Sequence, residues 1–530
     1  MGSAFIAIDN LGQGRFLQNT ARSLKIMMGP GQGGQVKVSG SEEERIISGY
    51  PGTTPRRMTN DTSLADSWTN PPLTDFSHLT TQVKAEETTM ESHEVAWAPG
   101  ELDNPQNRTL ASKRIITVVC CIVALDVAFA SSAPSMACAS IAHEHKVSVQ
   151  MSTWVTSLYL CGYIAGPLLW GPLSELIGRQ PVLLGTFGAY TLLQLGAALH
   201  TNLHVIFVSR ALTGFFASGP LTNSGAVLAD MWVFFGSQVT SQWDSAHRVQ
   251  ALSWQVTMPF LGTALGPVIG SAIDQSRFGY RWIFWGIMIF SGATWFLILF
   301  TMPETYSPIL LAKKAKNIRE TTGDIKFYAP HEKADCSLRG ILRRTILRPV
   351  EMMLTEPILS LIVIYLSIIC GMLYSLLETF PIIWQDIRGF KSHETSMIFL
   401  GLGFGAVLGG FLQLYFARPM KNLMPKWNGH PPCEMNLYGA MFAGPFFVGG
   451  ILWLGWTGAY ALIPWWVPAL STVMLGMSYA ASALAASMIC RAIVGAVVPL
   501  FTRQMYIGLG TQWACTLVMF FFLSFSFTCQ

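Results

Sequence analysis

The sequence predicts an all-α, polytopic membrane protein built from two halves of six helices each. Only 12% of the residues are charged and 51% are hydrophobic, so there are too few charges to cover the surface of a water-soluble globular protein. Apolar runs of about 20 residues, each long enough to cross a hydrocarbon core of about 30 Å, recur along most of the chain. A long polar segment separates six of these runs from the rest.

Residues 1–110 are polar and rich in Gly, Ser, Thr and Pro, and we expect them to form a disordered cytoplasmic tail. Residues 111–302 are predicted to form the first half, and 303–357 a central cytoplasmic loop. The six helices of the first half are predicted at 115–136, 151–171, 181–200, 204–230, 249–272 and 281–302.

The second half, residues 358–530, is irregular around its fourth helix. Residues 465–501 would have to hold two spans, but two runs of about 20 residues and a turn need a longer segment. Helix 10 is therefore predicted to be shortened, with helix 11 beginning near Tyr479. The other helices of this half are predicted at 358–383, 395–416, 437–457 and 508–527.

Lys and Arg gather on one side of the predicted spans, and the central loop alone carries ten of them. Because positively charged loops stay in the cytoplasm, the N-terminus and the central loop are predicted to be cytoplasmic.

Thirteen residues, Trp170–Val182, form a polar hinge between two apolar runs. Its two glycines and two prolines are expected to break any helix, and Glu175 and Arg179 are spaced to pair across one turn. The pattern of Gly171, an acid at Glu175, then Gly178 and Arg179 resembles the loop between helices 2 and 3 of the major facilitator superfamily. This resemblance implies the major facilitator fold and a role in transport.

Helix 5 carries Gly262, Gly266 and Gly270 on one face, with Pro267 beside the middle glycine. Glycines at this spacing let two helix backbones approach closely, and the proline bends the span. A packing or dimerisation face is one interpretation. The pattern also resembles the helix 5 signature of drug:proton antiporters of the same superfamily, which its uniport and symport branches usually lack.

Arg210 lies inside the predicted helix 4, where an unpaired arginine costs at least about 2.5 kcal/mol. Asp126 in helix 1 is its best candidate partner, because a buried carboxylate carries a similar cost. Two interpretations stay open: a static pair or polar-cavity acid, and a carboxyl group that binds and releases a proton.

Glu378 is a second acid inside a span, one turn after Tyr374 in helix 7. In an architecture where helices 1, 4, 7 and 10 line a central cavity, Asp126 and Glu378 would face that cavity from opposite halves. A carboxylate flanked by aromatic rings suits an amphipathic cation. A solvated helix end is the competing explanation.

Further matches cover most of the chain from Asn104 to Trp513. The segments Tyr280–Trp285, Met302–Tyr306 and 479–505 resemble the fungal multidrug and polyamine antiporters. This resemblance implies a plasma-membrane exporter that works by alternating access and exchanges protons for a lipophilic or polyamine-like cation.

The expected partners are therefore the lipid bilayer, a small cationic substrate and protons, with the chain acting as a monomer. The ten cysteines show no spacing typical of a metal site, and no phosphate-binding glycine loop is present. We expect no metal, no cofactor, no nucleic-acid partner and no enzymatic activity.

Two alternatives remain open. The chain could export an endogenous secondary metabolite, which would look identical in sequence. It could also be a non-transporting protein that kept the fold, or a defective gene model, since 233–242 looks inserted and residues near Gly476 look missing relative to the family pattern.

Overall fold

The computed structural model describes residues 94–98, 100–101, 103–199, 202–232, 242–333, 351, 355–423, 438–482 and 488–529. All of them belong to one compact unit, Glu91–Gln530. Most of the predicted tail, and 233–241 of the apparent insertion, lie outside the described residues. The described end of the predicted tail is not disordered, because Val95 donates its backbone N–H to the carbonyl of Tyr328 at 3.0 Å.

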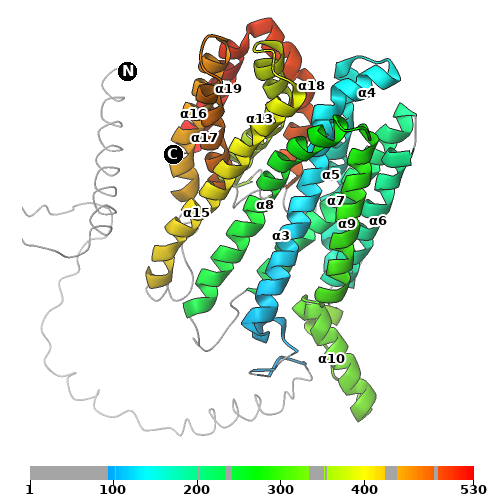
Figure 1. Ribbon diagram of the computed structural model, residues 1–530. Coiled ribbons are helices and arrows are strands. Elements are labelled where there is room, and N and C mark those ends of the chain that lie inside the picture. The colour runs from blue at the N-terminus through cyan, green and yellow to red at the C-terminus, as the bar shows by residue number, and fades with distance from the viewer. Residues whose placement is uncertain are drawn as a thin grey trace, which may run out of the picture. The chain divides into compact units, whose positions relative to one another are not determined.

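Six long helices form the first half, and short helices extend two of its connections (Figure 1). The long helices are α3 (Leu110–Ser132), α5 (Val149–Ile177), α6 (Arg179–Leu199), α7 (Leu203–Met231), α8 (Gln242–Asp274) and α9 (Arg281–Thr301). The short ones are η2 (Ala133–Ala137), α4 (Cys138–His145) and α10 (Ser307–Thr322).

Among the described residues, six long helices also form the second half of the fold. They are α13 (Pro357–Phe380), α15 (Phe399–Leu423), α16 (Tyr438–Gly458), α17 (Trp466–Ser482), α18 (Met488–Leu509) and α19 (Thr511–Cys529). A π-helical turn, Pro381–Asp386, extends α13, and the short α14 (Ser392–Met397) precedes α15.

The all-α prediction is confirmed for the described residues, where an isolated bridge between Glu94 and Tyr328 is the extent of strand pairing. Eight described helices are long and apolar enough to cross a membrane. Most predicted helix bounds lie within a few residues of the observed ones, because a long apolar run marks each of these segments.

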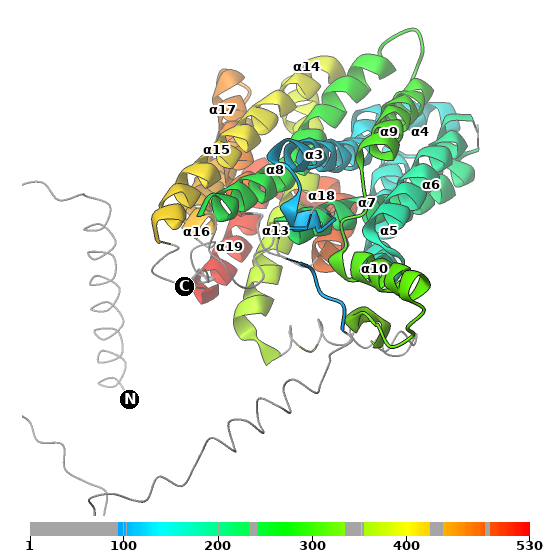
Figure 2. The ribbon, with the colours of Figure 1, turned by 90° about the horizontal axis from the view of Figure 1, so that it is seen from below.

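The two halves repeat one packing pattern (Figures 1 and 2). In the first half α3 packs on α8, α5 on α7, and α6 on both α7 and α9. In the second half α13 packs on α18, α15 on α17, and α16 on both α17 and α19. Helix α5 contacts α18, and α8 contacts α15, so these two helix pairs form the seam between the halves.

The three glycines of the predicted fifth span lie in α8, and they pack this helix against α3 within the first half. A Cβ on Gly262 would overlap the carbonyl oxygen of Leu125, and a Cβ on Gly270 would overlap that of Ala133. Gly266 likewise faces the hydroxyl of Ser132. The packing interpretation therefore holds inside the chain, where these glycines bring the two backbones into direct contact.

The predicted helix 10 corresponds to α17, whose described part has 17 residues, and its shortening stays a prediction. The expected start of helix 11 near Tyr479 is wrong, because that residue lies in α17 and the described part of α18 starts at Met488. The helix is continuous through Gly476, where the absence of a side chain lets α17 approach the carbonyl of Leu402 in α15.

Candidate functional site

In the hinge, the helical backbone is interrupted at a single residue. Helix α5 continues through Pro172 to Ile177, and α6 begins at Arg179 and includes Pro181, so the two hinge prolines do not break a helix as predicted. Gly178 adopts φ +120°, a conformation that side-chain-bearing residues rarely take. The turn at this end of the bundle therefore depends on one glycine, and we call this end the hinge end.

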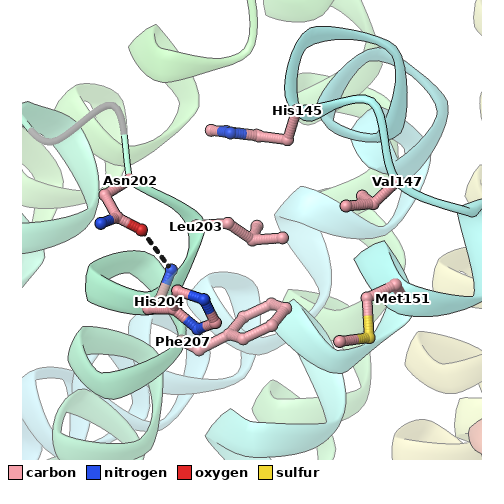
Figure 3. Close-up of a pocket in the computed structure, with 7 residues that line it drawn as sticks. All are labelled: His145, Val147, Met151, Asn202, Leu203, His204 and Phe207. Atoms are coloured by element: carbon pink, nitrogen blue, oxygen red, sulfur yellow. Dashed lines mark hydrogen bonds between the residues drawn. The ribbon is translucent and has the colours of Figure 1, made fainter.

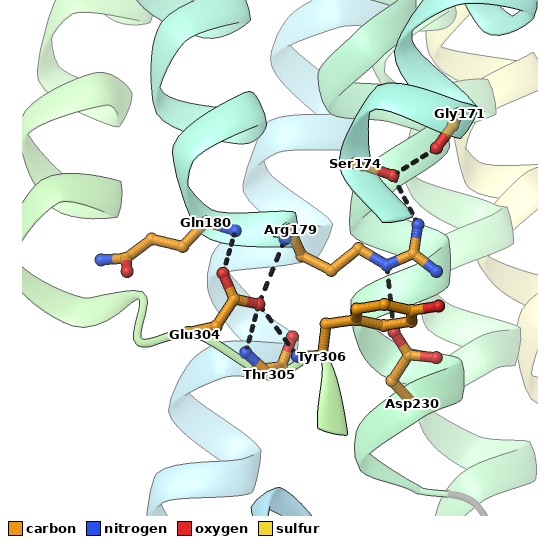
Figure 4. Close-up of polar contacts among 8 residues, drawn as sticks. All are labelled: Gly171, Ser174, Arg179, Gln180, Asp230, Glu304, Thr305 and Tyr306. Atoms are coloured by element: carbon orange, nitrogen blue, oxygen red, sulfur yellow. Dashed lines mark hydrogen bonds and ion pairs between the residues drawn. The ribbon is translucent and has the colours of Figure 1, made fainter. Parts of the chain in front are cut away.

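Glu304, just after α9, caps the first turn of α6 (Figure 4). Its Oε1 accepts the backbone N–H of Arg179 at 3.1 Å, and its Oε2 accepts that of Gln180 at 3.2 Å. Oε1 also accepts the backbone N–H groups of Thr305 and Tyr306, both at 2.9 Å. A carboxylate at a helix N-terminus satisfies free N–H groups and favours the helix dipole.

Arg179 is paired, but not with Glu175 as predicted. Its Nε donates to Oδ2 of Asp230 in α7 at 3.0 Å, and its Nη1 donates to the hydroxyl of Ser174 at 2.5 Å. The guanidinium group also lies over the ring of Tyr306, 4.9 Å from its centre. Glu175 is exposed. The charged group of the hinge therefore binds α7 and the segment after α9, not its own turn.

Arg210 is fully buried and also lacks the predicted acidic partner. Its Nη2 donates to the carbonyl of Ala130 at 2.9 Å, and its Nε donates to that of Val155 at 3.0 Å. Pro134 has no N–H to offer the Ala130 carbonyl four residues earlier, so this oxygen is free to accept the arginine. The ring of Tyr159 lies 4.4 Å from the guanidinium group. Arg210 thus fastens the end of α3 to α5 and α7.

Asp126 faces the interior of the first half, and the expectation that it faces a central cavity is wrong. Its Oδ1 accepts the hydroxyl of Tyr190 in α6 at 3.3 Å, and Thr294 of α9 lies beside it. Its Oδ2 is buried and has no hydrogen-bond partner among the described residues. Helices α6 and α9 do not belong to the seam with the second half.

Glu378 and Tyr374 of α13 do lie at the seam between the halves. The hydroxyl of Tyr374 is 3.1 Å from that of Ser131 in α3. Glu378 is buried, 8% exposed, and Thr153 of α5 lies beside its carboxyl group. The interpretation of Glu378 as an acid at a solvated helix end is therefore wrong. Of the two predicted intramembrane acids, Glu378 is the one that lies between the two halves.

Among the described residues, two hydrogen bonds join the halves near the end of the bundle opposite the hinge. Ser271 and Ser396 are 2.5 Å apart, and Gln150 at the start of α5 donates to the carbonyl of Leu500. The contact between Ser131 and Tyr374 lies farther inside the bundle, because η2 and α4 continue from α3 to His145. The halves are thus joined by polar contacts at the far end, while Glu175 at the hinge end is exposed.

A pocket of about 610 Å³ lies in the first half near the far end (Figure 3). Its histidines come from different elements, His145 from α4 and His204 from the start of α7. The ring Nε2 of His145 lies 3.1 Å from the hydroxyl of Tyr280. The pocket contains none of the predicted site residues. Its lining residues are His145, Val147, Met151, Asn202, Leu203, His204 and Phe207.

Asp230 and Glu304 are contributors that sequence reasoning missed. Glu304 lies in the segment Met302–Tyr306, whose resemblance to the fungal antiporters does not indicate a cap on a distant helix. Asp230 is an acid at the end of a long apolar helix, where a cation in reach is the expected partner. Among the described residues, no cluster of three or more His, Cys, Asp or Glu could hold a metal ion.

Residues 118–429 match the family model described as Major Facilitator Superfamily. The chain belongs to this superfamily. An MFS-type efflux pump of Trichophyton rubrum is 34% identical over 451 residues, which cover 81% of this chain and 73% of the pump. A major facilitator superfamily multidrug transporter of Candida albicans is 31% identical, over 79% of this chain and 70% of the transporter.

A third relative is the citrinin biosynthesis cluster MFS transporter of Monascus ruber, 32% identical over 84% of this chain and 91% of its own length. Among solved structures, the human organic anion transporter MFSD10 superposes with a TM-score of 0.54 at 17% identity. This match covers 80% of the present chain and the whole of the human one, and it shows the fold alone. The predicted major facilitator fold and the resemblance to fungal efflux pumps are confirmed.

Proposed function

We propose that the protein is a plasma-membrane exporter that exchanges protons for a lipophilic or polyamine-like cation. The observation that carries this proposal is the position of Glu378, a buried acid at the seam between the two halves. Fungal relatives named as efflux pumps and multidrug transporters support export. In the proposed orientation the N-terminus and the hinge end are cytoplasmic.

Glu378 would act as the shared site for proton and cation. A carboxylate at a buried seam attracts a cation, whereas a protonated carboxyl group does not, so protonation from outside would favour release of the cation. Tyr374, one turn away on α13, adds an aromatic face and a hydroxyl that already bridges to α3. When the seam opens on alternate sides, the two ligands would exchange there.

The test is efflux of a fluorescent lipophilic cation from yeast that lacks its own drug exporters. Export should rise as the external pH falls for the wild-type protein, and Glu378→Gln should remove this dependence. Glu356→Gln is a matched control, because Glu356 is exposed at the start of the same helix and its side chain caps nothing. Unchanged pH-dependent export by Glu378→Gln would exclude the acid as the coupling group.

A secondary metabolite is the second candidate substrate. Its support is the relative named for the citrinin biosynthesis cluster, together with Arg491 of α18, which lies beside Cys370 and Tyr374 of α13. A cation at this place suits a substrate with an acidic group. Cells loaded with a cationic dye or a carboxylate dye of similar size separate the two, because each substrate class predicts export of one dye. Export of neither dye favours a non-transporting protein.

A further inference from the structure

We propose that residues 94–98, 100–101 and 103–108 form a strap that holds the hinge in place through α10 and Glu304. The strap precedes α3 directly, and it contacts the segment that leaves α9 toward the second half. Releasing the strap would loosen the first turn of α6 and slow the conformational change of transport. The transport part of this inference rests on the proposed function, whereas the structural part does not.

The strap is attached to the region of α10 by a backbone pairing and a small apolar core. Val95 donates its N–H to the carbonyl of Tyr328 at 3.0 Å, next to the parallel bridge between Glu94 and Tyr328. Val95 is 7% exposed and packs with Ala315 and Ala329, which are fully buried. This cluster is separate from the main core of the helix bundle.

Polar contacts add to this attachment from one face of α10. Lys314 donates to Oε2 of Glu101 at 2.7 Å and to the carbonyl of Ala96 at 3.3 Å. The ammonium group also lies 5.3 Å from the ring centre of Trp97. The indole N–H of Trp97 donates to the hydroxyl of Ser307 at 2.7 Å, at the first turn of α10. Four contacts therefore join two segments more than 200 residues apart.

Residues close together in the chain connect the strap to the hinge. Ser307 accepts the indole of Trp97, the ring of Tyr306 lies under the guanidinium of Arg179, and Glu304 caps α6. Arg108 at the end of the strap donates to the carbonyl of Glu304 at 3.4 Å. Movement of α10 would therefore displace the cap of α6 and the stacking partner of Arg179 together.

This geometry suggests a mechanical role beyond anchoring. Every transport cycle that moves one half against the other must move the segment that joins them. The strap fixes the first part of that segment to the start of α3, so α10 would travel with the first half. The hinge then keeps its two fixed contacts, Glu304 and Asp230, throughout the cycle.

The first test is hydrogen–deuterium exchange of the purified full chain, with two variants on α10. Lys314→Ala removes the contacts to Glu101, Ala96 and Trp97. Lys316→Ala is the matched control, because Lys316 is exposed and pairs only loosely with Glu320 at 4.0 Å on its own helix. Lys314→Ala should raise exchange both in 94–101 and at the backbone amides of Arg179 and Gln180, which donate hydrogen bonds to Glu304. Lys316→Ala should change neither.

Exchange that rises in 94–101 alone would overturn the proposal, because the strap would then be an anchor without influence on the hinge. The second test is efflux, where Lys314→Ala should lower the maximal export rate about fivefold with an unchanged half-saturating concentration. An unchanged maximal rate would also overturn it. Lack of export by the wild-type protein would reject the proposed function and leave the exchange result standing.

Discussion

Tyr190 donates its hydroxyl to Asp126 at 3.3 Å, and both side chains are fully buried inside the first half. This contact removes Asp126 from the set of residues that face the seam. Thr294 of α9 lies beside the same carboxyl group. The first prediction concerns the contact with Tyr190.

Tyr190→Phe should destabilise the protein by about 1–3 kcal/mol, because it leaves a buried carboxyl oxygen without its donor. Asp126→Asn in the same background should cost less than the sum of the two single changes, since the pair is lost only once. Melting temperatures of the detergent-purified protein measure both. Tyr415→Phe, at an exposed tyrosine, is the control. Full additivity would contradict the pairing.

Arg210→Lys should also destabilise the protein, since one ammonium group cannot reach the carbonyls of both Ala130 and Val155 as the guanidinium does. The expected loss is about 2 kcal/mol, within the cost of leaving buried polar groups unpaired. Pro134→Ala should reduce that loss, because an alanine offers the N–H that the Ala130 carbonyl lacks. A Pro134→Ala change that makes Arg210→Lys worse would argue against this account.

Two glycine-to-alanine changes should have opposite signs. Gly270→Ala should destabilise the protein by about 1–3 kcal/mol, because its Cβ would overlap the carbonyl of Ala133 and push α8 away from η2, which continues α3. Gly225→Ala, in α7, meets open space and should stabilise by up to about 1 kcal/mol through helix propensity. Thermal unfolding of both variants measures the difference. Equal effects would show that the close approach is not needed.

The strap should loosen in acid. The hydrogen bond from Lys314, followed by that from the backbone of Ala98, holds the pKa of the Glu101 carboxyl below its ordinary value of 4.5. A group whose pKa is lowered by docking supports docking fully above its ordinary pKa, and this support is lost as the pH falls through the lowered value.

Exchange in 94–101, corrected for the intrinsic effect of pH, should therefore increase below about pH 4.5 and stay level from there to neutral pH. Glu101→Gln should show the higher exchange at every pH, with the acid step removed. A wild-type strap that loosens as the pH rises instead would contradict the assignment of Lys314 and Glu101.

The helices were predictable because each apolar run is long, and a bilayer demands such runs whatever the tertiary packing. The direction in which a side chain points from those helices was not predictable. Helix α3 is apolar on all sides, so its sequence could not show that Asp126 faces Tyr190 and not the second half. The aromatic neighbours of Glu378 in the sequence likewise do not show that this side chain lies between the two halves.

Partners far apart in the chain were the least predictable feature. Sequence spacing suggested that Arg179 pairs with Glu175, since four residues separate them, but a glycine at φ +120° ends the helical geometry which that spacing assumes. Arg179 instead binds Asp230, and Glu304 caps the helix it begins. Neither partner can be predicted from the neighbouring sequence, because both contacts depend on how α7 and α9 pack.

The cap on α6 also bears on how the chain is made. Glu304 lies 125 residues after the Arg179 amide that it accepts. At a synthesis rate of roughly 5–20 residues per second, about 6–25 s pass between the emergence of the two residues from the ribosome. During that interval the first turn of α6 lacks its acceptor, so the first half cannot reach its final form until α9 is complete. A nascent chain halted before Glu304 should remain a substrate for quality control.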